Sequence, residues 1–244
     1  MRTLNALLVR DFNTAYGRSP LGVAWAIAEP VIGIVLLTAV FSQISSVPPM
    51  GTSYPVFYAT GYLPFLLFTS VQGRVMSAPK QSSQLLSHAS LSVIDVIAAR
   101  ALLQSIVMGA VTLIVYAGVW VFCDPQETPA VGRLILAGAA ACSLGVAIGV
   151  LNSGLASFFP PWEKAWGVIT RPLFLISGVF YPFSAMPPSL QNALWWNPIL
   201  HLVGANREAV YAGYDASYVS PTYVMAVVMG SACVGLALLL TARR

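Results

Sequence analysis

Residues 134–158 read LILAGAAACSLGVAIGVLNSGLASF and contain no charged side chain. The hydrocarbon core of a bilayer is about 30 Å thick, and one helix of about 20 apolar residues crosses it. The stretch exceeds that length, and its many small residues are typical of helices that pack closely inside a membrane. It therefore predicts a transmembrane helix, and other parts of the sequence follow the same pattern.

The whole chain is poor in charge. Its 244 residues include 12 Lys and Arg and 8 Asp and Glu, 57% are hydrophobic, and the mean hydropathy is +0.77. A water-soluble fold could not cover its surface with so few polar groups. The apolar runs are residues 23–44, 54–76, 102–122, 134–158, 165–182 and 219–241, of which the fifth is the shortest. We therefore predict an all-α polytopic membrane protein with six transmembrane helices and no separate soluble domain.

The cationic residues gather in alternate connecting segments. One set of segments holds Arg2, Arg10, Arg18, Arg74, Lys80, Arg100, Lys164, Arg171, Arg243 and Arg244. The other set holds only Arg133 and Arg207. Because Lys and Arg favour the cytoplasmic side, both termini are predicted to be cytoplasmic. The basic pI of about 9.1 then reports orientation, and nucleic-acid binding is not needed to explain it.

The sequence contains no motif for nucleotide binding or hydrolysis. Its two lysines, Lys80 and Lys164, do not belong to a GxxxxGK loop, and HExxH, CxxC and GxSxG are absent. The histidines, His88 and His201, are assigned to opposite faces of the membrane, so no metal site is predicted. Work by this protein would need an ion gradient or a separate nucleotide-hydrolysing chain.

One face of the helix predicted at 54–76 is aromatic. Its members are Tyr54, Phe57, Tyr58, Tyr62, Phe65 and Phe68. At about 100° per residue these side chains share about 140° of helical arc. Helix packing with an interfacial aromatic belt would explain the pattern, and so would a translocation path on which sugar rings stack. The residues alone leave both interpretations open.

Glu29 and Arg171 are the two charges that we expect inside the membrane. A charged side chain at that depth is costly unless it is neutralised, paired or hydrated. For Glu29, which precedes Pro30, an ion pair that fixes helix packing and a role in gating are equally supported.

Three segments outside the apolar runs also carry patterns. Residues 1–20 repeat apolar side chains at helical spacing, which predicts an amphipathic helix in the membrane interface. The polar segment 79–89 exposes the pair Leu85-Leu86, and such a pair usually has a partner. Residues 189–210 are too polar for a span and are divided by Asn197-Pro198, which predicts a re-entrant hairpin beside a cavity or pore.

These segments together resemble a known family. Residues 18–22, RSPLG, with Trp25 and Glu29-Pro30, resemble the entry to the first span of ABC-2 type exporter membrane subunits. Residues 176–182, ISGVFYP, with Asn197-Pro198 and Arg207, look like the C-terminal signature of that family. Residues 85–103 are most similar to those of bacterial capsule polysaccharide exporters. The matches follow one another in the right order along the whole chain.

The resemblance implies a permease rather than an enzyme. It would be the membrane subunit of an ATP-driven exporter that moves lipid-linked capsular polysaccharide across the bacterial inner membrane. A homodimer would bind two cytoplasmic ATP-binding subunits, which would hold ATP and Mg, and this chain would hold no cofactor. Periplasmic and outer-membrane export proteins would be further partners. Alternatives are an O-antigen or teichoic-acid exporter, an ion-coupled carrier, or an intramembrane glycolipid-modifying enzyme that uses His201 and Glu208.

The resemblance also implies roles for particular residues within a single domain of residues 1–244. Coupling to the ATPase falls on a helix at 81–88, with Gln84, Leu85, Leu86, Ser87 and His88. The substrate path would use Tyr54, Phe57, Tyr58, Tyr62, Phe65, Trp195 and Trp196. Residues 189–210 would form the gate, and Glu29 and Arg171 would be gating or packing charges. No catalytic or metal-binding residue is implied.

Overall fold

The structure, a computed structural model, describes residues 20–82, 92–123 and 125–242. Within these ranges it contains helices and no strand, which confirms the all-α prediction. The helices are α2 (Pro20–Phe41), α3 (Tyr54–Met76), α4 (Ala78–Gln81), α6 (Val93–Cys123), α7 (Val131–Phe158), α8 (Trp162–Ile176), the 3-10 helix η1 (Phe183–Ala185), α9 (Pro188–Leu194), α10 (Pro198–Val210) and α11 (Pro221–Thr241). The predicted interfacial helix of residues 1–20 falls almost wholly outside the described ranges.

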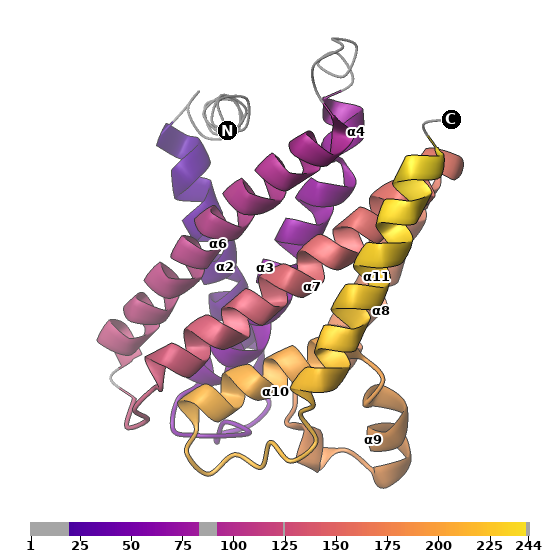
Figure 1. The fold of residues 1–244 in the computed structure, drawn as a ribbon. Helices are drawn as coiled ribbons and strands as arrows, with labels where there is room; N and C mark the ends of the chain where they lie inside the picture. The colour runs from indigo at the N-terminus through magenta and orange to yellow at the C-terminus, as the bar shows by residue number, and fades with distance from the viewer. Residues whose placement is uncertain (1–19, 83–91, 124, 243–244) are drawn as a thin grey trace.

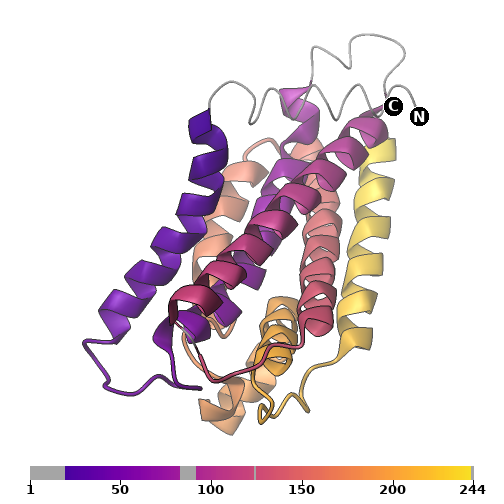
Figure 2. The same ribbon diagram turned by 90° about the vertical axis from the view of Figure 1, so that its left-hand side faces the viewer.

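The long helices run roughly side by side between two ends of the molecule. Successive long helices run in opposite directions, and the start of α2 lies at the same end as the close of α11 (Figure 1). We call this the α4 end, because α4 lies there, and the opposite end the α10 end. Helices α9 and α10 gather at the α10 end, beneath the bundle in both views (Figures 1 and 2).

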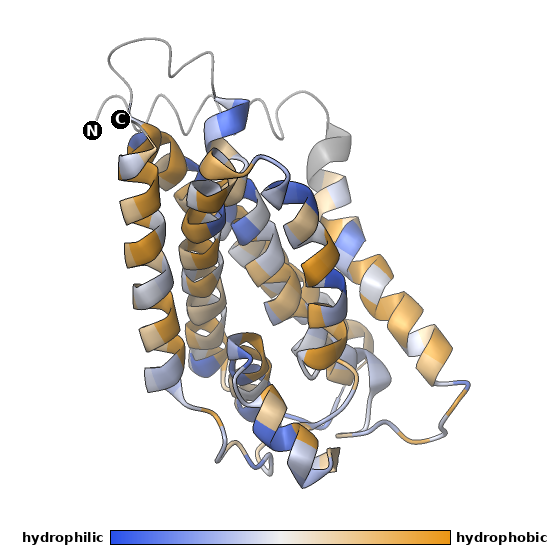
Figure 3. Ribbon diagram, turned by 90° about the vertical axis from the view of Figure 1, so that its right-hand side faces the viewer, coloured by the Kyte–Doolittle hydropathy of each residue, from blue (hydrophilic) through white to orange (hydrophobic). Residues whose placement is uncertain are grey.

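Four helices are long and apolar enough to cross a membrane: α2, α6, α7 and α11. Many residues along α2 and α11 are hydrophobic (Figure 3). Helix α8 has 15 residues, which rise about 22 Å and fall short of the hydrocarbon core. Helix α3 has 23 residues, but side chains such as Gln72 and Arg74 make it less apolar than its neighbours.

Helix α3 forms the centre of the bundle and is buried along most of its length. It packs against α7, α6, α10 and α2. Close approach to α7 depends on two glycines one turn apart. A Cβ on Gly145 would lie 2.9 Å from the carbonyl oxygen of Phe68, and a Cβ on Gly149 would lie 2.6 Å from the Cβ of Val75. These small residues therefore position α3 against α7.

Two helix boundaries differ from the apolar runs for local reasons. Helix α6 begins at Val93, well before residue 102, because the Asp95 carboxylate accepts a hydrogen bond from the Ser92 amide at 3.1 Å and caps the first turn. Helix α8 ends at Ile176, short of residue 182, and Gly178 follows with φ +77°. Only glycine adopts that angle without strain, so the chain turns there toward α9.

Candidate functional site

The aromatic face of α3 points into the chain. Phe57 and Tyr58 are 0% exposed and Phe65 is 7% exposed, whereas Tyr54 and Tyr62 are half-buried. The rings of Tyr54 and Tyr58 stack with centroids 6.3 Å apart. Within a single copy of the chain, most of this face is therefore packed.

Tyr62 differs because it lies between two helices that do not belong to the centre of the bundle. Its ring centroid is 5.9 Å from that of Phe174 in α8, and Phe65 is 4.9 Å from the same ring. A Cβ on Gly33 of α2 would lie 2.5 Å from the Tyr62 ring. The Glu29 carboxylate, one turn earlier in α2, is near enough to interact electrostatically with Tyr62. Tyr62 is thus a partly accessible ring that lies against both α2 and α8.

A second aromatic cluster surrounds Trp195 and Trp196 at the α10 end. The Trp195 ring lies 5.3 Å from Trp196, 5.2 Å from His201 and 4.9 Å from Tyr223, measured between centroids. Trp195 Nε1 donates to the Tyr218 carbonyl at 3.0 Å, and Trp196 is 68% exposed. In the described parts of the chain, no ring contact joins this cluster to the α3 face. The structure therefore divides the predicted path residues between two places.

Arg207 of α10 is buried, and it contacts both α3 and the segment that follows α8. It is 1% exposed, and its Nη1 and Nη2 donate to the carbonyls of Tyr181 at 2.8 Å and Val179 at 3.2 Å. Its guanidinium carbon lies 4.5 Å from the centroid of the Phe57 ring, which is a cation–π contact. A Cβ on Gly61 would lie 2.8 Å from the Val179 carbonyl oxygen. Arg207 thus links α10 to α3 and to the segment that follows α8.

Glu29 and Arg171, the two charges expected inside the membrane, do not lie in the interior of the single chain, and their role as gating or packing charges stays a prediction. Both are exposed, and Arg207, which was assigned to an outer connecting segment, is buried instead. It contacts backbone carbonyls, the Phe57 ring and the Tyr214 side chain, and within the described ranges no carboxylate forms an ion pair with it. Every residue has a carbonyl, so the sequence carries no signal that would have found these acceptors.

His201 and Glu208 do not form an acid–base pair. They stand seven residues apart on α10, which is about 10 Å along the axis. His201 Nδ1 accepts from the Ser220 amide at 3.1 Å, and Nε2 lies 2.7 Å from the Trp195 carbonyl, so the neutral ring carries its hydrogen on Nε2. Burial lowers the pKa of His201. Glu208 instead faces Arg133 at 3.4 Å.

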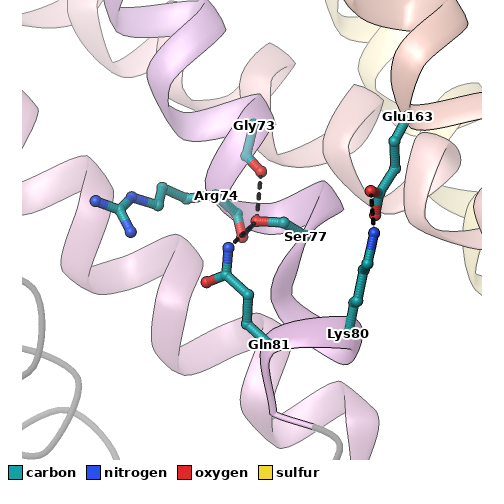
Figure 4. Close-up of polar contacts among 6 residues, drawn as sticks. All are labelled: Gly73, Arg74, Ser77, Lys80, Gln81 and Glu163. Carbon is teal, nitrogen blue, oxygen red and sulfur yellow. Dashed lines mark hydrogen bonds and ion pairs between the residues drawn. The ribbon is translucent and has the colours of Figure 1, made fainter.

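The α4 end contains a polar network that joins three helices. Lys80 Nζ lies 2.8 Å from Glu163 Oε2 at the start of α8 (Figure 4). Gln81 Nε2 donates to Ser77 Oγ at 3.2 Å, as the same view shows. Arg100 of α6 donates to Gln81 Oε1 at 2.7 Å. The end of α4 is therefore attached to both α8 and α6.

The predicted coupling residues follow directly after this network. Gln84, Leu85, Leu86, Ser87 and His88 lie outside the described residues.

Comparison with known proteins identifies the family of the chain. Residues 2–211 match the ABC-2 type transporter family, and this match covers most of the chain. The chain belongs to the ABC-2 type transporter family. This confirms the resemblance drawn from the sequence, and it classes the molecule with membrane permeases.

Several relatives match over nearly the whole length. The polysialic acid transport protein KpsM of Escherichia coli is 31% identical over 236 residues, which are 97% of this chain and 92% of that protein. The capsule polysaccharide export inner-membrane protein CtrC of Neisseria meningitidis serogroup B is 24% identical over 92% of this chain and 84% of its own length. The corresponding protein BexB of Haemophilus influenzae is 26% identical over 90% of this chain and 83% of its own length. The homologues of this permease are thus inner-membrane proteins of capsule polysaccharide export.

Proposed function

We propose that the chain is the membrane subunit of an ATP-driven exporter that moves lipid-linked capsular polysaccharide across the bacterial inner membrane. The observation that carries this proposal is the near full-length similarity to capsule export proteins within the ABC-2 family. ATP and Mg would be held by two cytoplasmic ATP-binding subunits, and the permease would act as a homodimer. Periplasmic and outer-membrane export proteins would take over the glycan.

The proposal places six crossings in the membrane, with α3 and α8 added to the four apolar helices. Helix α3 is shielded by its neighbours, so its polar residues need not face lipid. Helix α8 can cross in spite of its length if residues 177–182 and the protein around them complete the path. With six crossings, most of the cationic residues, but not Arg133, Arg171 and Arg207, would collect at the α4 end, which would be cytoplasmic.

Coupling would run from residues 84–88 through the network at the α4 end. Leu85 and Leu86 would insert into a groove of the ATP-binding subunit. A displacement there would reach α8 through the Lys80–Glu163 ion pair and α6 through the contact of Arg100 with Gln81. The amphipathic helix of residues 1–20 would lie in the same interface.

The substrate path is proposed between α2 and α8, at a seam with a second copy of the chain. The exposed surface of α8 carries Arg171, that of α2 carries Glu29, and neither charge suits contact with lipid. A second copy would cover both charges and enclose Tyr62. Sugars would stack on the partly accessible rings, while the buried rings beneath would hold them in place.

The exit gate is proposed at α9 and α10, which would form the re-entrant hairpin. The Asn197 side chain accepts from the Ile199 amide at 3.0 Å and caps α10 directly after the break. Trp195 and Trp196 lie at this break, and Trp196 is exposed. They would contact the glycan as it leaves the path.

A co-purification experiment tests the proposal. The tagged chain should retain a phosphate-loop ATPase from native membranes and should hydrolyse no ATP without it. The Leu85→Asp/Leu86→Asp variant should lose the ATPase while inserting normally in the membrane, since charge would prevent docking in an apolar groove. A matched control is Leu236→Asp/Leu240→Asp on α11, which should harm insertion and not the docking surface. Robust ATP hydrolysis by the isolated chain would contradict the proposal.

The nature of the glycan is tested separately. Deletion of the gene should leave lipid-linked polysaccharide inside the cell, and its composition distinguishes capsular material from O-antigen or teichoic acid. Accumulation of either of the latter two would retain the exporter and replace the substrate.

A further inference from the structure

A cavity of about 350 Å³ lies between α3, α6 and α7. Its walls include Leu67 of α3, Gly109 and Leu113 of α6, and Ile135 and Gly138 of α7, and Asn206 of α10 also reaches it. On α3, the lining residue Pro64 stands two positions after Tyr62 and the lining residue Leu67 two positions after Phe65, and each step is a rotation of about 200°. The cavity is therefore on the opposite side of α3 from the contacts with Phe174.

The mouth of the cavity is on the outer surface of the bundle. Ile106, Leu113 and Ile135 line it and are 61%, 45% and 54% exposed. They belong to α6 and α7, two helices that can span a membrane. In a bilayer the mouth therefore faces the hydrocarbon region, from which water is excluded.

The length and position of the cavity fit one leaflet. On α6 its lining extends from Ser105 to Tyr116, which is about 16 Å at 1.5 Å per residue. Half of the hydrocarbon core measures about 15 Å. On α7 the lining residues lie between 134 and 142, in the half nearer α10, and on α3 and α6 the lining begins near the middle of the helix. The cavity therefore extends from the middle of the bundle toward the α10 end (Figure 1).

Two polar side chains in the wall, Asn206 and Tyr116, are already hydrogen-bonded to the protein. Asn206 Nδ2 donates to the Thr60 carbonyl at 2.8 Å and to the hydroxyl of Tyr116. That hydroxyl in turn lies 3.4 Å from the Ala59 carbonyl. The amide hydrogens of Asn206 are thus both used. What the cavity offers a ligand is mainly apolar surface, and an apolar cavity left empty loses dispersion contacts along its walls.

We propose that this cavity binds an acyl chain of a membrane phospholipid from the leaflet on the α10 side. The mouth faces away from Tyr62 and α8, so bulk phospholipid meets it directly, whereas cargo moving between α2 and α8 does not. The bound acyl chain fills the space between α6 and α7. It also packs beside Asn206, the residue of α10 that lines the cavity, and helps to hold that side chain in place.

Photocrosslinking tests this assignment. The full chain is reconstituted in nanodiscs of phosphatidylethanolamine and phosphatidylglycerol in which a fraction of the acyl chains carry a diazirine. After irradiation, mass spectrometry of the peptides should place adducts on residues 105–116 and 134–142. In Gly109→Leu these adducts should fall at least fivefold, because a Cβ at Gly109 has no atom within 4 Å and the new side chain fills the cavity without a clash.

Gly118→Leu is the matched control. It lies on the same helix, its Cβ is equally free, and nine residues of α6 place it half a turn away from Gly109. Its adduct pattern should equal that of the unchanged protein. Should Gly109→Leu fail to give a monodisperse peak on size exclusion, Gly138→Ala, whose Cβ meets only Leu67 at 3.7 Å, provides a milder filling.

Three results would overturn the assignment. Equal adducts in the unchanged protein and both filling variants would remove the cavity as the binding site. Adducts spread evenly over α11 would indicate nonspecific contact with the bilayer. Displacement of the probe by purified lipid-linked glycan, but not by excess phospholipid, would assign the cavity to the anchor of the cargo.

Discussion

At the scale of single residues, Arg207 contacts parts of the chain that are distant in sequence. One guanidinium fixes two carbonyls from the segment after α8 and lies against a ring of α3. Two of its nitrogens reach carbonyls two residues apart, and its rigid planar fork holds these donors in a fixed geometry that a compact, flexible ammonium lacks. The residue therefore acts as a structural link between segments distant in sequence.

Replacing Arg207 by Lys or Gln should destabilise the fold by about 3 kcal/mol, because buried carbonyls lose charged hydrogen bonds. Lys should not restore stability. The free energy of unfolding in mixed detergent measures the effect. Arg133→Gln is the control, since that side chain is 67% exposed in a surface ion pair and should change stability by less than about 1 kcal/mol. A stable Arg207→Lys variant would show that the planar geometry of the guanidinium is not needed for the stability of the fold.

The sequence predicts the positions of the long helices better than it predicts which side chains are buried. The apolar runs located the long helices because a bilayer requires such runs. The burial of Phe57 and Tyr58 could not be separated from an exposed path, because aromatic side chains suit both environments. Arg207 looked like an ordinary charge of a connecting segment. Its burial depends on the turn at Gly178, which brings two carbonyls within reach of α10.

At the scale of elements, the boundaries were harder to predict than the existence of each helix. Helix α6 extends beyond its apolar run because Asp95 caps a polar first turn. The break at Asn197-Pro198 was visible in the sequence, and it separates α9 from α10 as expected. The side chains that hold the two helices in place are not periodic, and their partners lie in the segment after α8, in the loop before α11 and in α11 itself.

One of these contacts makes the α9–α10 region sensitive to acid. His201 is neutral in the fold, where burial lowers its pKa below the ordinary value of 6.5. As the pH is lowered, His201 therefore takes up a proton in the unfolded chain before it does so in the folded chain. The free energy of unfolding has its full value above pH 6.5 and decreases as the pH is lowered through that value. A proton on Nδ1 would also remove the acceptor of the Ser220 amide.

We therefore expect amide hydrogen exchange at 195–220 to accelerate between pH 7.5 and 5.5, after correction for intrinsic rates. The His201→Gln variant should have a lower stability that no longer depends on pH in this range. Phenols ionise only near pH 10, so neighbouring tyrosines stay neutral here. An unchanged pH dependence in the variant would show that another group is responsible.

At the scale of the whole molecule, the exposed surfaces of α2 and α8 predict an assembly of two copies. Ile32 of α2 and Leu175 of α8 are 46% and 56% exposed and stand at similar distances from the α4 ends of their helices. In a chain without its native cysteines, Ile32→Cys with Leu175→Cys should form a disulfide-linked dimer on oxidation in membranes. Non-reducing electrophoresis measures the product.

The control pairs Ile32→Cys with Met229→Cys, since Met229 of α11 is 58% exposed but belongs to a different face. It should remain monomeric under the same oxidant. Efficient crosslinking through Met229 and none through Leu175 would place the seam between the two copies on α11. The second copy would then not enclose the proposed path between α2 and α8.

The position of Arg207 also has a consequence for synthesis of the protein at the ribosome. Helices α2 to α8 are made before it, yet the ring of Phe57 and the carbonyls at 179 and 181 receive their common partner only when α10 emerges. Until then the newly made bundle has an open centre that quality-control proteases can recognise. Chains stalled between residues 182 and 200 should therefore be short-lived in the cell, although most of their apolar helices have already been inserted.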